Sequence, residues 1–503
     1  MIIPRLLLTF VFAVNMHFIH AQMNEYIDAD NFHAAQNITY GFKPWYEHEN
    51  ALPAGVVTIS PSGDATGEKD RNNIQQAIES MHDAGGGKIQ LEPGKYYVNN
   101  VLAIRSNVII RGAGRDSTII RNTRTAGDQI SWNAMMPGIH HPAFHTRDKE
   151  DDYQKIKIAS TTAGTDTFIV LDGTFDGPVF TNQNNRAKWD NDKPEVGDLV
   201  MICDYDHGRD GQSAENWPKA VTHHWTQYAK ITEINGYKVT IDEPHVHDRD
   251  EGVVFWIPEK PPFASRANLD LFWTDNCVIG DMTFENTPGL IYGYVGVRNM
   301  LFENINTVNI SGSKKGFQIQ GLYKSTIRNC YTEVEGGRCF EIKHGSARSL
   351  LEDCKFDVVG ATSWRPAIST GESVYAIHFN NNEWHYHVDP HPTTYMFMRS
   401  ETYGGSFTNN YIHGEQGVSF PSGASMFSIS SNAGTLNHEN SEFDYFPYFY
   451  HRVTGYTLWK DNRIDIDVGI GYDIRTGDNT GRYWTKGIKI SGDDWTEIGR
   501  AHV

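Results

Sequence analysis

The sequence predicts an all-β solenoid, a fold in which successive turns of the chain stack on one another. A phrase of alternating apolar residues followed by Asn or Asp recurs along the chain, at intervals of 23, 25 and 24 residues. Looser copies follow at intervals of 28, 29 and 52 residues, and we interpret the last interval as two turns. A fixed period with strand-like alternation is typical of a solenoid. The phrases end at Asp281, Asn304, Asn329, Asp353, Asn381, Asn410 and Asn462.

The bulk composition agrees with this fold class. The chain has 503 residues, which is long for one compact core but natural for a solenoid with attachments. Its net charge is −18, so nucleic acid is not an expected partner.

The N-terminal residues 1–22 have the pattern of a secretory signal peptide. Arg5 precedes the apolar run Leu6 to Val14, and Ala21 gives a cleavage end. The run is short for a membrane span, and no second long apolar stretch follows. We therefore expect a secreted protein without a membrane span, extracellular or periplasmic, and we expect a monomer.

Five cysteines in an exported chain would permit disulfides. Cys330 and Cys354, however, each follow the Asn or Asp of their phrase, at the position of Met282 and Ile305. We therefore expect buried thiols in an apolar column.

Residues 23–122 are expected to form an N-terminal extension, a cap and the first turns. The spacing of Ile74, Ala77, Ile78 and Met81 predicts a short amphipathic helix over 73–83. The stretch GDATGEKDRNNIQQAIESMHDAGGGKIQLEPGKYYV, followed by SNVIIRGAGRDSTIIRN, resembles the start of pectate-lyase-like right-handed parallel β-helix proteins. The resemblance implies that the solenoid is right-handed and that the helix caps its open end, where strand edges would otherwise be unpaired.

Residues 123–265 interrupt the period and are expected to form an inserted antiparallel β region. KPEVGDLVMICDYD and YAKITEINGYKVTIDEP are typical of antiparallel strands, the latter with a turn at Asn235-Gly236. Residues 266–503 are then the main parallel β-helix, whose turns lengthen after Ala361 with aromatic-rich loops that favour a binding face.

Alignment of the repeats predicts an outward column of polar residues. Phe317 and Ile319 should stack inward on Phe340 and Ile342, which leaves the residues between them on the outer face. These outer residues are Gln318, Gln320, Glu341 and Lys343, with Tyr292 and Tyr294 one turn earlier and Arg365 and Arg399 in later turns.

Such a column suits a lyase acting on a uronate polysaccharide. A cation, amide or metal neutralises the uronate carboxylate, and a base removes the C5 proton. The phrase FEIKHGSARSLLEDCKF is similar to the Lys-bearing turn of the alginate and chondroitin-B lyase family, and this implies catalytic roles for Lys343 with Arg365 or Arg399. That family's acidic calcium-binding triplet is not matched, so no cofactor is assigned, and a divalent cation such as calcium is kept as an option. His344 is an alternative base and Glu341 an acid.

We therefore predict a secreted enzyme that cleaves an anionic extracellular polysaccharide by β-elimination. The first alternative is a glycoside hydrolase with paired carboxylates on the same fold, and the second is a non-catalytic carbohydrate-binding solenoid. The candidate hydrolase carboxylates are Glu333, Glu335, Glu341 and Glu372. The predicted substrate-binding residues are Gln318, Gln320, Tyr292, Tyr294, Arg338, Trp364 and Trp384.

The segment HYHVDPH allows two interpretations. Its alternating residues are of metal-ligand type and would lie on one side of an extended strand. They are His385, His387, Asp389 and His391. We favour the other interpretation, in which the segment forms, with Trp384 and Tyr386, an aromatic wall for sugar stacking.

Overall fold

The computed structural model of the protein describes the chain from residue 55 onward, with gaps. The described ranges are 55–123, 154–171, 194–204, 227–245, 252–256, 273–420, 425–429 and short strands between 458 and 491, with short breaks inside the longer ranges. The predicted signal peptide, 1–22, lies outside them. Within the described part, no helix has both the length and the apolar character that crossing a membrane requires.

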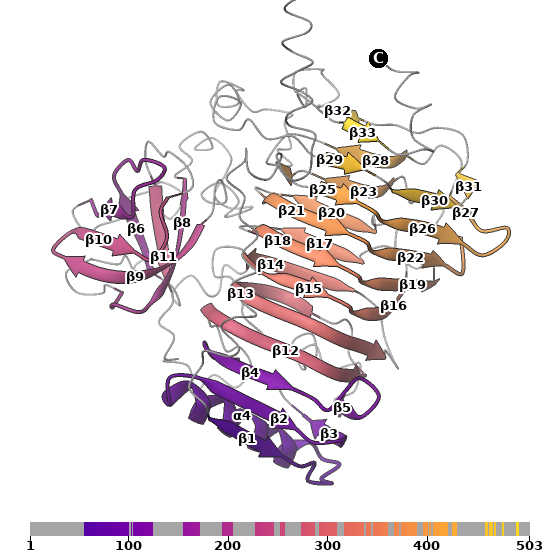
Figure 1. The fold of residues 1–503 in the computed structure, drawn as a ribbon, viewed down its shortest axis with the longest axis horizontal. Coiled ribbons are helices and arrows are strands. Elements are labelled where there is room, and N and C mark those ends of the chain that lie inside the picture. Colours follow the sequence, from indigo (N-terminus) through magenta and orange to yellow (C-terminus); the bar gives the residue numbers. More distant parts are fainter. Residues whose placement is uncertain are drawn as a thin grey trace, which may run out of the picture.

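Parallel strands stack into a solenoid that runs from the N-terminal turns at the bottom of Figure 1 to the last turns at its top. Each strand pairs with the equivalent strand of the next turn, so the neighbours along one sheet are about two dozen residues apart in sequence. The predicted right-handed parallel β-helix with a capping helix and an inserted antiparallel region is confirmed.

Three faces make up each turn, and we number them in chain order. The first face contains the start of β13 (Ile291–Val308) and then β14 (Phe317–Tyr323), β17 (Phe340–Lys343), β20 (Ile368–Gly371), β23 (Met396–Ser400), β28 (Ser425–Ile429) and β32 (Arg475–Thr476).

The second face is the longest and includes the middle of β12 (Trp273–Glu285) and of β13. Its other strands are β1 (Val56–Ile59), β2 (Gly87–Leu91), β4 (Val108–Arg111), β15 (Thr326–Arg328), β18 (Ala347–Glu352), β21 (Val374–Asn380), β24 (Thr402–Tyr403), β25 (Ser406–Thr408), β29 (Leu458–Lys460) and β33 (Lys489–Ser491).

The third face receives the ends of β12 and β13. Its other strands are β3 (Gly94–Val98), β5 (Thr118–Asn122), β16 (Tyr331–Glu335), β19 (Lys355–Gly360), β22 (Glu383–Tyr386), β26 (Tyr411–Gly414) and β30 (Arg463–Asp465). Beyond its edge, β27 (Ser419–Phe420) pairs with β31 (Asp467–Val468).

The recurring Asn or Asp makes the turn from the second to the third face. Five residues of the predicted series have left-handed backbone conformations, which Asn and Asp adopt more readily than other non-glycine residues. They are Asp281, Asn304, Asn329, Asp353 and Asn381, with φ between 50° and 59°.

Two details of the predicted repeat are wrong. Asn409, not Asn410, has the left-handed conformation, with φ 55°. Asn410 and Asn462 instead follow the turn and are buried. The 52-residue interval is also one turn rather than two, because β25 pairs directly with β29 and β26 with β30. The residues between β28 and β29, 430–457, lie outside the described part of the structure.

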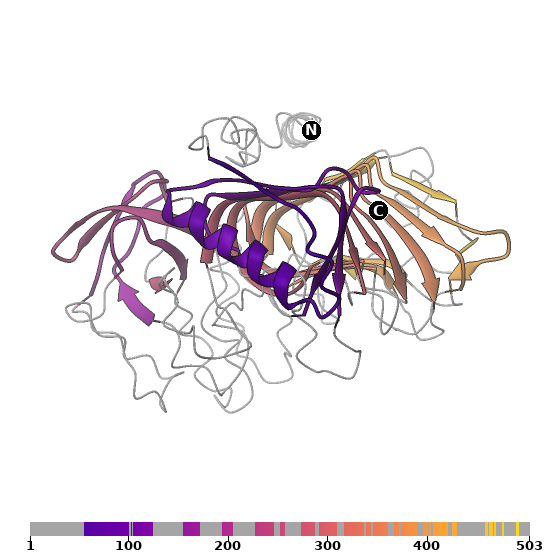
Figure 2. The ribbon, with the colours of Figure 1, turned by 90° about the horizontal axis from the view of Figure 1, so that it is seen from below.

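Helix α4 (Glu68–Asp83) covers the N-terminal end of the solenoid, as Figure 2 shows. It begins five residues before the start expected from its apolar spacing. Asp70 explains the difference, since this buried carboxylate accepts hydrogen bonds from the backbone N–H groups of Ser62 and Tyr97 at 2.7 and 2.9 Å. The buried face of the helix therefore extends from Ile74 toward the N-terminus as far as Asp70, a polar residue.

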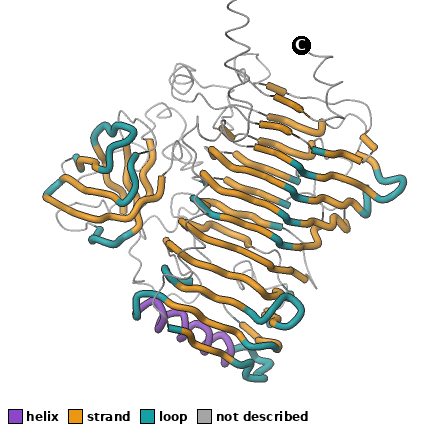
Figure 3. Tube along the Cα trace, viewed as in Figure 1, coloured by secondary structure: helices purple, strands orange, loops and turns teal. Residues whose placement is uncertain are grey.

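The inserted region forms a six-stranded antiparallel sheet beside the solenoid (Figures 1 and 3). The predicted turn at Asn235-Gly236 joins two antiparallel strands, and Gly236 has φ 59°. The strands, in spatial order, are β6 (Gln154–Ile158), β11 (Gly252–Trp256), β8 (Leu199–Asp204), β9 (Gln227–Asn235), β10 (Lys238–Ile241) and β7 (Thr167–Ile169).

The interior of the solenoid is filled by residues that stack from turn to turn. The rings of Phe317 and Phe340 stack with centroids 5.4 Å apart, as their alignment predicts. Cys330 and Cys354 are buried free thiols, so the prediction of buried thiols in this column is confirmed.

Candidate functional site

On the first face, the backbone positions of the predicted polar column are in register. Backbone register places Tyr292 opposite Gln318, Gln318 opposite Glu341, and Glu341 opposite Ser369. The column continues through Arg399 on β23. These positions alternate with buried Phe317, Phe340, Ile342 and Ile368. Stacked strands lie about 4.8 Å apart, and Glu341 and Arg399 are two strands apart. Their backbone positions are therefore separated by roughly 10 Å.

A second column on this face contains Tyr294, Gln320 and Lys343, in register one above the other. Gly371 follows Lys343 in the next turn. The side chains of these strand residues lie outside the described part of the structure, as do Arg338, His344, Trp364, Arg365 and Glu372 altogether. The register therefore brings Lys343 beside the Glu341–Arg399 column, while the roles of the individual side chains stay predictions.

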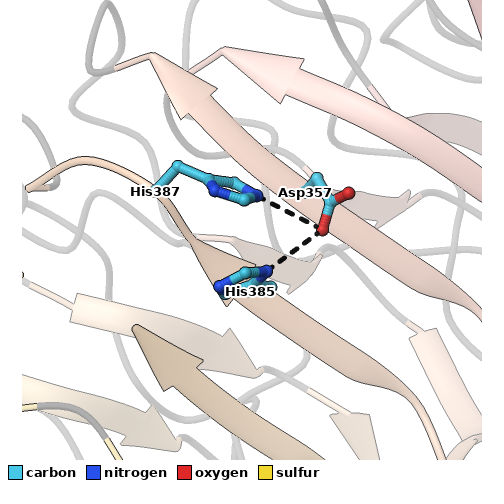
Figure 4. A group of neighbouring side chains, drawn as sticks. All are labelled: Asp357, His385 and His387. Atoms are coloured by element: carbon cyan, nitrogen blue, oxygen red, sulfur yellow. Dashed lines mark ion pairs between the residues drawn. The ribbon is translucent and has the colours of Figure 1, made fainter. Parts of the chain in front are cut away.

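The third face gathers imidazole and carboxylate side chains at the ends of β19 and β22. Asp357 pairs with His385 across adjacent strands. Its Oδ1 atom lies 3.5 Å from His385 Nδ1 and 3.6 Å from His387 Nε2. Figure 4 shows both imidazoles directed toward this one oxygen. All three side chains are partly buried.

Two further side chains hold this cluster from outside. The Tyr331 hydroxyl donates a hydrogen bond of 2.6 Å to Asp357 Oδ2. Glu415 Oε1 lies 3.1 Å from His387 Nδ1 and 3.8 Å from His385 Nε2. Burial, followed by the neighbouring imidazoles of His387 and His413, lowers the pKa of His385. Neutral imidazole is the form that coordinates metal ions.

A second polar group lies beside the cluster on the same face. Glu383 Oε1 accepts from Lys355 Nζ at 3.1 Å and contacts His413 Nε2 at 2.9 Å. Burial raises the pKa of Glu383, but the hydrogen bonds from His413 and Lys355 outweigh it and leave the pKa lowered. The His413 ring stacks on those of His385 and Tyr411, each at 4.3 Å. Cationic, anionic and aromatic groups are thus packed on consecutive turns.

The aromatic wall predicted for this segment is wrong. Trp384 and Tyr386 point into the solenoid and are 0% and 4% exposed, and the Trp384 ring stacks on Phe356 at 5.7 Å. The strand alternation explains this, because the residues between them are the outward ones. Trp384 therefore cannot present its face to a sugar.

The predicted histidine set is only partly brought together. His385 and His387 converge, but their third partner is Asp357, one turn earlier, and exposed Asp389 is not part of this group. His391 lies outside the described residues. Sequence reasoning missed Asp357 because it is 28 residues from His385. Alignment of KFDVV with EWHYH in the repeat would have identified it.

Comparisons with known proteins give short matches. No family model matches the chain. Mannuronan C5-epimerase AlgE6 of Azotobacter vinelandii is 34% identical over 89 residues, 16% of this chain and 10% of that protein. Alginate lyase 7 of the same organism is 35% identical over 91 residues, 17% of this chain. The chain thus spans about a tenth of the length of each relative. A tailspike of Pseudomonas phage phi297 is 12% identical with a TM-score of 0.38, covering 83% of this chain and 67% of that one.

Proposed function

We propose that this chain is an exported enzyme that cleaves an anionic, uronate-containing polysaccharide by β-elimination. The observation that carries the proposal is the register of the first face, which aligns Gln318, Glu341 and Arg399 in one column and sets Lys343 in the next. An amide, a carboxylate and two cations thereby occupy backbone positions on β14, β17 and β23, with β20 between the last two. These are the groups that proton abstraction beside a carboxylate needs.

The proposed reaction begins with the uronate carboxylate against Arg399. The charge of Arg399 stabilises the negative charge that develops when the C5 proton leaves. Lys343, or His344 next to it, takes that proton. The C–H electron pair forms the C4–C5 double bond, the C4–O bond breaks, and an acid protonates the leaving oxygen. The products are an unsaturated uronate and a new reducing end.

The short relatives support a polyuronate substrate. Both are named for mannuronan or alginate, which are polymers of uronic acids. Epimerisation at C5 and β-elimination share one step, removal of the C5 proton. The similarity of the matched segment to both relatives is therefore compatible with removal of a C5 proton by this chain.

The test is to incubate purified protein with mannuronan, alginate, polygalacturonate, and neutral and sulfated glycans. The ultraviolet absorbance of the unsaturated uronate is followed together with reducing ends. We expect both to rise with a polyuronate. Lys343→Ala should reduce the rate by about 10²–10⁴-fold if Lys343 is the base. Lys88→Ala, at a half-buried position of β2 in the N-terminal turns, is the matched control and should keep the rate.

Three other outcomes would overturn the lyase. Reducing ends without absorbance would indicate glycoside hydrolysis. The observation that favours this second candidate is the run of described carboxylates on the third face, which would then be mutated: Glu333, Asp357, Glu383, Glu415 and Asp465. Binding without either product would indicate the non-catalytic solenoid. Incorporation of deuterium at C5 from heavy water without cleavage would instead indicate epimerisation.

A further inference from the structure

Asp357 has an oxygen atom that the protein itself leaves unsatisfied. Oδ2 accepts the hydrogen bond from Tyr331, but Oδ1 is inaccessible to solvent and has no hydrogen-bond partner. A buried carboxylate oxygen without a partner carries a large desolvation cost. The atoms it faces are the ring nitrogens of His385 and His387 (Figure 4).

The separations fit a shared cation better than direct hydrogen bonds. The two N···O distances, 3.5 and 3.6 Å, are too long for hydrogen bonds. Ligands bound tetrahedrally at about 2.1 Å from a metal ion are about 3.4 Å apart along each edge. The two edges from Asp357 Oδ1 thus already have the spacing of a tetrahedral site, and the ligand atoms of all three residues lie within 4.8 Å of one another.

The hydrogen-bond pattern of His387 supports the same conclusion. Its Nδ1 lies 3.1 Å from Glu415 Oε1, so Nδ1 donates and a neutral ring has its lone pair on Nε2. That lone pair faces the unpartnered oxygen of Asp357. Two acceptors facing each other repel unless a cation lies between them. An imidazole whose second nitrogen binds a carboxylate is the usual outer arrangement of a metal ligand, and Tyr331 supports Asp357 in the same way.

The backbone holds these groups in place. Asp357 and His385 are paired residues of adjacent parallel strands. The His387 backbone N–H donates to the Val358 carbonyl oxygen at 3.0 Å. Lys355 Nζ approaches Asp357 Oδ1 only to 3.9 Å and lies closer to Glu383, at 3.1 Å. The Lys355 ammonium group thus pairs mainly with Glu383. It does not fill the space between Asp357, His385 and His387, which another cation can occupy.

We propose that Asp357 Oδ1, His385 Nδ1 and His387 Nε2 bind one divalent transition-metal ion of the zinc type. Two imidazoles and one carboxylate suit zinc, whereas calcium and magnesium prefer oxygen ligands throughout. Three protein ligands leave the fourth position to water or to an oxygen of a ligand. This site is on the third face and does not depend on the lyase proposed for the first.

The test is metal binding to the full chain in the absence of polysaccharide. Protein is treated with a chelator, freed of it, and titrated with zinc, then separately with calcium and magnesium, by calorimetry. We expect one zinc ion per chain and much weaker binding of the other two. Cobalt in place of zinc should give the intense visible absorption of tetrahedral coordination. A hexacoordinate cobalt spectrum or a preference for calcium would overturn the proposal.

Variants locate the ion. His387→Ala and Asp357→Asn should abolish stoichiometric binding, and Glu415→Gln should weaken it by about 10–100-fold through His387. Glu415 is more than half exposed, so this last variant should fold normally. Asp389→Ala is the matched control from the same segment, and should bind like the unaltered protein. Equal zinc affinity in all four variants would show that the ion binds elsewhere and would refute the site.

Discussion

Two regions of the molecule bury polar side chains in contrasting ways. After the turn between the second and third faces, Asn382, Asn410 and Asn462 form a ladder of neutral amides. Each side-chain oxygen accepts the backbone N–H of the preceding rung, at 2.9 Å from both Asn382 and Asn410. Where the inserted sheet meets the solenoid, the buried groups are charged.

The charged junction has two centres. Arg298 makes bidentate contacts with both Asp275 and Asp242, at 2.6–3.0 Å. Asp275 also pairs with Lys230 of β9 at 3.1 Å. In the second centre, Glu243 of the inserted region contacts Arg348 and Lys324, each at 2.5 Å. Strands distant in sequence thus meet through ion pairs.

The difference concerns how each polar group finds its partner. In the ladder the partner is the same residue type one turn away, so the repeat geometry itself provides it. At the junction each charge depends on an opposite charge from another segment, and removal of one leaves the other buried. We therefore expect the junction to be more sensitive than the ladder to substitution and to acid.

Asp275→Ala should have the largest effect. Arg298 and Asp275 are 4% and 1% exposed, so loss of the carboxylate leaves a buried guanidinium with reduced compensation. We expect a cost of about 3–5 kcal/mol, concentrated where the inserted sheet meets the solenoid. Hydrogen exchange read by mass spectrometry should show lost protection in β9 and β10. Protection of β22 and β26, beside the amide ladder, should change little.

The matched control is the double variant Asp275→Leu with Arg298→Met. Removal of both charges avoids the unpaired guanidinium, so this variant should recover part of the lost stability. A double variant less stable than Asp275→Ala would show that the ion pair contributes more than its desolvation cost, contrary to this expectation.

Asn410→Ala should have the next largest effect. The Asn410 amide accepts from the backbone and side chain of Asn382 and donates to Phe379 O at 3.0 Å and to Asn462. Its removal leaves several buried groups without partners, and we expect a loss of about 2–3 kcal/mol in urea unfolding. The neighbouring Asn409→Ala replaces an exposed left-handed residue and should cost about 1 kcal/mol. Equal costs would contradict the distinct roles of these two residues.

The fold could be predicted because its turn signal is local. Asp281, Asn304, Asn329 and Asp353 each follow a run of alternating residues and adopt the left-handed conformation that their residue types tolerate. The prediction slipped by one residue at Asn410, since Asn409 and Asn410 are adjacent and either fits the phrase. Only the cross-strand hydrogen bonds separate a turn residue from a ladder residue.

The candidate sites show a different limit. The first-face column was predictable, since register follows from the repeat. The Asp357–His385–His387 cluster follows from the same register, since KFDVV aligns with EWHYH, but it was missed because the type of Trp384 alone did not show which residues of that strand point outward. A second column of left-handed residues, including Lys324 and Arg348, was also missed, because these residue types rarely adopt that conformation. Their contacts with Glu243 compensate it.

Acid should lower the stability of the charged junction but not that of the amide ladder. Burial raises the pKa of Asp275, but the charges of Arg298 and Lys230 outweigh it and lower the pKa to about 2. A depressed carboxyl pKa contributes stability above the unfolded value of 3.8, and this contribution is lost as the pH falls from about 4 toward 2. The full contribution is about 2 kcal/mol, and about 1 kcal/mol of it should be lost between pH 5 and pH 3, seen as a lower urea midpoint at pH 3.

The control is to measure the urea midpoint of Asp275→Asn at the same two pH values. This variant lacks the titrating group, so its midpoint should fall less between pH 5 and pH 3. An equal fall in both proteins would assign the acid sensitivity to other carboxylates. The amide ladder does not titrate, and Asn410→Ala should therefore shift the midpoint by the same amount at both pH values.

Cys354→Asn should have the smallest effect, since it extends the ladder by one rung. The Cys354 backbone N–H already donates to Asn382 Oδ1 at 3.0 Å. Ladder amides donate to a carbonyl of the preceding turn, such as Leu351 O for Asn382, and the equivalent Ile327 carbonyl lies 3.9 Å from Cys354 Sγ. An acceptor is thus in place for the introduced amide, and we expect stability within about 1 kcal/mol of the unaltered protein.

The reverse change, Asn410→Cys, should cost nearly as much as Asn410→Ala, because a thiol cannot replace four hydrogen bonds. Urea unfolding and hydrogen exchange of β19, β22 and β26 measure both changes. If Cys354→Asn proves as costly as Asn410→Cys, each turn is specific for its own residue. A small cost for Cys354→Asn and a large cost for Asn410→Cys would show that an amide is tolerated wherever the adjacent turn offers partners. The apolar and amide turns would then differ in their neighbours rather than in their backbone.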